Sequence, residues 1–133
     1  MRFVDTSFWV ALRFRRDANH DAAVRLWAPG RALLTTNHVV GETWTFLRRR
    51  EGHASAVAYL DAVDAATWLT VLRIDDSIER EAWAWLRRHD ERAHSFVDAT
   101  SFALKADIKL ALPGAEKDKL EALIKEAHEI CPY

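Results

Sequence analysis

Short apolar runs alternate with longer amphipathic stretches along this chain, and this alternation constrains the fold more than any other feature. Each run is bounded by polar or turn-forming residues and is short enough to be one buried strand. Strands separated by helices indicate a parallel sheet, so we expect an α/β protein with three α/β/α layers and a central parallel sheet. The expected strands are Phe3-Val4, Ala32–Thr35, Trp68–Ile74 and Ile108–Leu112.

Capping residues and helix breakers bound the helical segments between these strands. We expect Thr6 or Ser7 to cap the first helix, Asn37 to open the third, and Asp76 with Glu79 to form a capping box. Apolar spacing predicts helices over residues 8–16, from 19 to a break at 29–30, and over 37–50, 54–66, 76–88, from 95 onward and 116–129.

The length and composition indicate one globular domain. A chain of 133 residues, half of them apolar and six of them Trp, can form one core over residues 1–133. No apolar run approaches the ~18 uninterrupted residues of a membrane span, so no membrane partner is expected. The single cysteine, Cys131, excludes an internal disulfide and fits a reducing cytoplasm, which predicts a cytoplasmic protein.

Arginine is locally clustered although the net charge is only −1. The clusters lie at residues 13–16, 48–50 and 87–88. If the clusters converge on one rim of the folded protein, their side chains can contact the phosphates of a nucleic acid. We therefore take as candidate RNA contacts Arg13, Arg15, Arg48 and Arg49. The alternative is that these arginines are solvated helix ends, where a positive charge is favoured by the helix dipole.

Three acidic residues occupy positions where a charge is unfavourable. Asp5 ends an apolar strand, Glu42 lies at the edge of an apolar helix stripe, and Asp98 lies on the apolar side of a helix. A half-buried carboxylate without a partner is costly, and a shared hard cation removes that cost. Such a cation can activate water and neutralise a phosphodiester, so this trio indicates a metal-dependent hydrolase.

Two of the three acids have an alternative explanation in helix capping. Asp5 can cap the helix that follows its strand, and Ser95 with Asp98 satisfies the capping-box pattern. Glu42 has no capping role at its position. The six His residues show no ligand spacing on one helix, and no Gly-rich phosphate loop is present.

Over residues 1–104 the chain resembles the PIN-domain ribonuclease toxins of the VapC type. The resemblance rests on three blocks that follow one another in the order of that family's motifs. The blocks are Phe3–Ser7, Leu34–Asn37 continuing into Val40–Thr43, and Ser95–Ala103.

The resemblance implies a PIN-like fold and an endoribonuclease that cleaves RNA with Mg²⁺ or Mn²⁺. It implies that Asp5, Glu42 and Asp98 are the catalytic, metal-holding acids, and that Thr6 and Ser7 order the site. It also implies the toxin half of a type II toxin–antitoxin pair, which forms homodimers and is inhibited by a cognate VapB-type antitoxin.

The last quarter of the chain departs from the family pattern. The family has a short strand ending in Phe-Asp, whose Asp is a fourth acid. Here Glu116 and Asp118 are nearby but lie outside such a motif, which leaves them as candidates for the fourth acid. Loss of that acid leaves open an alternative function, a catalytically inactive PIN scaffold that binds RNA or an antitoxin peptide.

Residues 105–133 resemble a C-terminal fragment of the OsmC/Ohr peroxide-reductase family. Every Arg precedes this segment and every Lys lies within it. Peroxide reduction in that family needs two cysteines, and this chain has one, so that chemistry cannot occur. We hypothesise a chimera joined between about Phe102 and Ala106, with a divergent, Lys-rich PIN C-terminus as the alternative.

Overall fold

The computed structural model describes residues 1–111, which form a parallel sheet flanked by helices. The strands β1 (Arg2–Phe3), β2 (Leu33–Thr36) and β3 (Leu69–Leu72) lie in the order β1-β2-β3. Leu33 of the buried central strand pairs with Arg2 on one side and Leu69 on the other. The predicted α/β class with a central parallel sheet is therefore confirmed.

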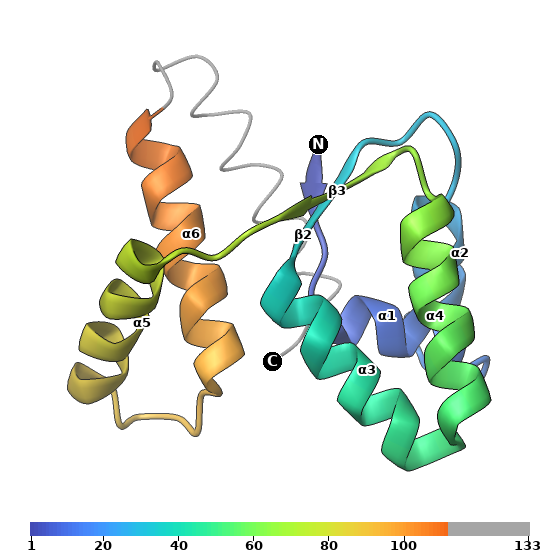
Figure 1. Ribbon diagram of the computed structural model, residues 1–133, viewed down its shortest axis with the longest axis horizontal. Helices are drawn as coiled ribbons and strands as arrows, with labels where there is room; N and C mark the ends of the chain where they lie inside the picture. The colour runs from blue at the N-terminus through green and yellow to red at the C-terminus, as the bar shows by residue number, and fades with distance from the viewer. Residues whose placement is uncertain (112–133) are drawn as a thin grey trace.

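Helices lie on both sides of these strands. Figure 1 shows α5 and α6 paired on one side, while α1 to α4 gather on the other. Within the described part of the chain, no helix has the length and apolar character needed to cross a bilayer. The helices are α1 (Thr6–Arg13), α2 (His20–Leu26), α3 (Asn37–Glu51), α4 (His53–Ala65), α5 (Asp76–Arg88) and α6 (Phe96–Ala111).

The core is built from the strands and from the inward faces of the helices. Phe8 of α1, Leu33 of β2 and Leu47 of α3 are among the largest fully buried side chains. Trp9 adds edge-to-face contacts with Phe8 and with Tyr59 of α4, each with ring centres 5.2 Å apart. The Trp9–Tyr59 contact joins α1 to α4, and α1 carries residues of the site described below.

Three helices are capped by the extended residue that precedes them. Asp5 caps α1, Thr36 caps α3 and Asp75 caps α5, each accepting a hydrogen bond from an amide of the first turn. A cap needs extended backbone, which the residue leaving a strand already has. Helix α3 begins at Asn37 as predicted. The predicted caps Thr6 or Ser7 and Asp76 are wrong by one or two residues, because Asp5 and Asp75 cap these helices.

Helix α6 occupies part of the segment expected to be the last strand. It continues to Ala111, so the strand predicted over Ile108–Leu112 is wrong for residues 108–111, and Leu112 lies outside the described residues. Ile108 follows Leu104 by one helical turn and packs against the core, so this short apolar run fits a helix face as well as a strand. The predicted helix over 116–129 and the acids Glu116 and Asp118 also lie outside the described residues.

Candidate active site

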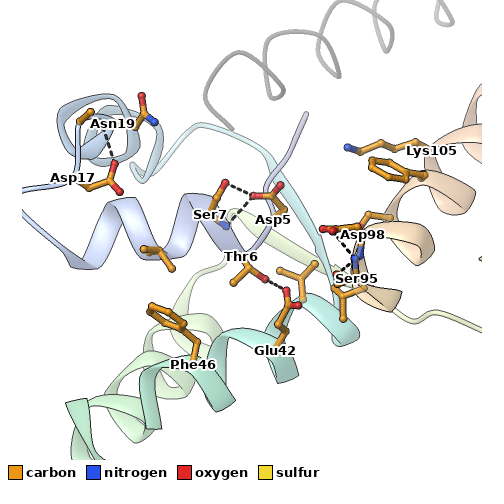
Figure 2. A pocket seen from close by; sticks show the side chains of 16 residues that line it. Asp5, Thr6, Ser7, Asp17, Asn19, Glu42, Phe46, Ser95, Asp98 and Lys105 are labelled. Carbon is orange, nitrogen blue, oxygen red and sulfur yellow. Dashed lines mark hydrogen bonds between the residues drawn. The ribbon is translucent and has the colours of Figure 1, made fainter. Parts of the chain in front are cut away.

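An open pocket of about 650 Å³ lies just beyond the carboxyl ends of β1 and β2. Parallel α/β sheets commonly bind their ligands at this edge. The structure brings Asp5, Glu42 and Asp98 together here although they come from three separate segments, the end of β1, α3 and α6. Figure 2 shows the three side chains around the same hollow.

Asp5 is held by the first turn of α1. Its Oδ1 accepts hydrogen bonds from the Ser7 amide at 3.0 Å, the Ser7 hydroxyl at 2.8 Å and the Phe8 amide at 3.3 Å. The capping role considered for Asp5 is therefore real, and it coexists with a place on the pocket wall. The cap fixes the direction of this carboxylate before any ligand binds.

Glu42 projects from the second turn of α3 into the same pocket. The Thr6 hydroxyl donates a hydrogen bond to its Oε2, which links α1 to α3 (Figure 2). Burial raises the pKa of Glu42, the Thr6 bond lowers it, and the negative charges of Asp98 and Asp5 raise it further. The net pKa is above the ordinary value of 4.5, so the folded pocket disfavours the ionised form of Glu42.

Asp98 is exposed, contrary to the expectation that it lies on an apolar face. It forms the capping box with Ser95: the Ser95 amide donates to Asp98 Oδ2 at 2.9 Å, and the Asp98 amide donates to Ser95 Oγ at 3.0 Å. These bonds give hydrogen-bond acceptors to two backbone amides at the start of α6, and they turn the Asp98 carboxylate toward the pocket.

The raised pKa of Glu42 makes the metal-free stability pH-dependent in a defined direction. The folded chain holds the Glu42 proton to a higher pH than the unfolded chain does, so the ionised group destabilises the fold. Without divalent cations, we expect Glu42→Gln to gain stability over wild type as pH rises from the ordinary carboxyl pKa toward neutrality. Urea unfolding at several pH values in EDTA measures this difference.

The control for that measurement removes one negative charge elsewhere. Glu81 is exposed on α5 and lines no part of the pocket. Glu81→Gln should not show the growing advantage expected for Glu42→Gln. An advantage of Glu42→Gln that stays constant with pH, or a wild type that is more stable near neutrality, would contradict the raised pKa of Glu42.

The candidate RNA-contact arginines separate into different environments. Arg49 lines a groove that adjoins the acidic pocket, together with Arg50. Arg13 forms an ion pair with Glu51, with Nε 2.7 Å from Oε2. Arg15 and Arg48 are exposed and line neither the pocket nor that groove.

The pocket also contains residues that the sequence did not single out. Ser101 and Lys105 lie three and seven positions after Asp98, on the same face of α6, and helical periodicity could have identified them. The Lys105 Nζ lies 4.6 Å from the centre of the Phe3 ring. Asp17 enters from the loop after α1, and no sequence pattern marks it.

Comparison with known proteins gives matches that span most of the chain. The PIN domain family model matches residues 2–112. The 23S rRNA-specific endonuclease VapC20 from two strains of Mycobacterium tuberculosis is 54% identical over 105 residues, which cover 78% of this chain and 79% of the relative. The crystal structure of M. tuberculosis VapC20, described as a sarcin–ricin loop cleaving toxin, superposes with a TM-score of 0.70 at 50% identity, covering 80% of this chain and 82% of the other.

The family match also bears on the proposed chimera. It extends to residue 112 and so crosses the hypothesised join between about Phe102 and Ala106. Helix α6 is continuous over the same residues. The OsmC/Ohr origin is therefore not supported. The chain belongs to the PIN-domain family, in its VapC group.

Proposed function

We propose that this chain is a metal-dependent endoribonuclease, the toxin of a type II toxin–antitoxin pair, with Asp5, Glu42 and Asp98 as its metal-holding catalytic acids. The observation that carries the proposal is that these three carboxylates line one open pocket, where burial and the charges of Asp98 and Asp5 raise the pKa of Glu42. The relationship to a VapC endonuclease supports the reaction class.

The donor atoms in the pocket fit a hard divalent cation. The acids and the hydroxyls of Thr6 and Ser7 supply oxygen, and among the described residues no His or Cys lines the pocket. Within residues 1–111, no three His, Cys, Asp or Glu side chains are grouped tightly enough to hold a metal ion by themselves. Because protein-bound Mg²⁺ usually keeps several of its waters, some of the three carboxylates would hold it through a water molecule.

The protein's own groups preorganise this site. Asp5, Glu42 and Asp98 would hold Mg²⁺ or Mn²⁺, which when bound acidifies a coordinated water and neutralises charge on the scissile phosphodiester. Thr6 and Ser7 keep two of the carboxylates oriented through hydroxyl hydrogen bonds. Because these contacts form before substrate arrives, little reorganisation is left for the reaction.

The substrate and partners follow from the relatives. We propose the sarcin–ricin loop of 23S rRNA as the substrate, because VapC20 is named as a 23S rRNA-specific endonuclease and described as cleaving that loop. We also propose a cognate VapB-type antitoxin as the inhibitor and a homodimer as the assembly, as in the family that the chain resembles.

Removal and return of metal tests this function. We expect cleavage of a 23S rRNA fragment containing the sarcin–ricin loop to stop in EDTA and to return with Mg²⁺ or Mn²⁺. Calorimetric titration of the full chain with either ion should show saturable binding that Glu42→Gln weakens, since the variant removes one ligand charge.

Two results would change the proposal. Unchanged cleavage in EDTA would exclude these acids as a metal site. Metal binding without cleavage at any manganese concentration would instead favour the inactive scaffold that binds RNA or an antitoxin peptide.

A further inference from the structure

A second groove continues from the acidic pocket along helix α3. It has a volume of about 490 Å³ and shares Glu42 and Phe46 with the pocket, so the two hollows are contiguous. Its other lining residues are Thr45, Arg49 and Arg50. Thr45, Phe46, Arg49 and Arg50 lie three, four, seven and eight positions after Glu42, which makes one continuous stripe of the helix surface.

The middle of this stripe is an exposed aromatic ring. Phe46 keeps 37% of its surface exposed. Its ring meets Phe14 edge to face with the centres 6.2 Å apart, so it is supported from the α1 side. Figure 2 shows Phe46 near Glu42 on α3, facing the hollow.

The far end of the stripe is positively charged, whereas the pocket is acidic. Arg49 and Arg50 lie in the last turn of α3, and the Arg50 guanidinium carbon is 5.8 Å from the centre of the Phe14 ring. Phosphates are repelled by the carboxylates, so a bound strand needs cations close to them. An aromatic ring followed by arginines is the arrangement that binds unpaired nucleic acid through stacking and phosphate contacts.

We propose that the RNA strand next to the cleavage point lies along this groove, with one unpaired base stacked on Phe46 and the adjoining backbone held by Arg49 and Arg50. The inference rests on the proposed nuclease function and adds the path of the substrate. It also separates Arg49 and Arg50 from Arg48, which lies six positions after Glu42 and off the stripe.

Binding of a short unpaired oligoribonucleotide tests this path, with cleavage suppressed by an Asp5→Asn background. Phe46→Ala should weaken binding about five-fold to a hundredfold, and Phe46→Trp should retain it. The double variant Arg49→Gln, Arg50→Gln should lower the slope of log K against log salt by about 0.7 for each phosphate that the protein no longer neutralises.

Arg48→Gln is the matched control, because Arg48 is an exposed arginine in the same helical turn. It should leave both the affinity and the salt slope close to the parent values. The path is overturned if Arg48→Gln has as large an effect as the double variant, or if Phe46→Ala binds RNA normally. It is equally overturned if the groove variants change only the sedimentation of the protein, since the groove then joins two copies.

Cleavage kinetics separate failure of the path from failure of the nuclease assignment. In the otherwise wild-type chain, the groove variants should raise KM for a long RNA more than they raise KM for a dinucleotide. Asp5→Asn should abolish cleavage of both substrates. Cleavage that depends on Asp5 but is insensitive to every groove variant would overturn the path alone.

Discussion

Substitution of Asp5 by Asn is expected to lower RNA cleavage by about three orders of magnitude while leaving the fold intact. Asn caps helices as well as Asp does, so the amide hydrogen bonds at the start of α1 can persist. The substitution removes one negative charge from the pocket wall, and with it the hold on a divalent cation. Single-turnover cleavage with saturating Mg²⁺, combined with circular dichroism of the variant, measures both effects.

Asp75→Asn supplies the matched control for this experiment. Asp75 caps α5 as Asp5 caps α1, accepting the Ile78 amide at 3.0 Å, but it does not line the pocket. Its substitution should leave both stability and cleavage near wild type. If Asp5→Asn cleaves RNA at the wild-type rate, the metal-site assignment is wrong and the reaction belongs to another site or to a contaminant.

Phe8→Ala is expected to cost about 3–5 kcal/mol of unfolding free energy. Phe8 is only 2% exposed and its ring meets Trp9 edge to face. Truncation leaves a cavity under the first turn of α1, the turn that carries Thr6 and Ser7. Because a domain of this size is marginally stable, this decrease is a large part of its total stability. Urea denaturation followed by Trp fluorescence measures it.

An exposed apolar residue provides the comparison for Phe8. Val24 on α2 is 48% exposed, so Val24→Ala should change the unfolding free energy by less than about 0.5 kcal/mol. A Phe8→Ala variant that unfolds at the same urea concentration as Val24→Ala would show that the packing around α1 does not determine the stability of this fold.

Most elements of the fold could be predicted from local pattern. The segments around Leu33 and Leu69 are strands and those around Val39 and Ile78 are helices, as expected, because side-chain periodicity is a property of neighbouring residues. The strand predicted around Ile108 is wrong because local periodicity was the only signal there, and it did not distinguish a strand from a helix. A five-residue segment with four apolar residues fits either periodicity, and packing of Ile108 against the core is a contact that the sequence does not display.

Less of the candidate site than of the fold could be predicted from the sequence. The sequence alone determined which acids are candidates and that Glu42, unlike Asp5 and Asp98, has no capping role. Only the tertiary structure decided that the three share a pocket, because their meeting depends on how α1, α3 and α6 pack around the sheet. The adjoining stripe from Glu42 to Arg50 was present in the sequence as a helical repeat. Only the structure shows that this stripe is the face of α3 that the core leaves exposed. The sequence could not show this, because burial is set by contacts between residues far apart in the chain.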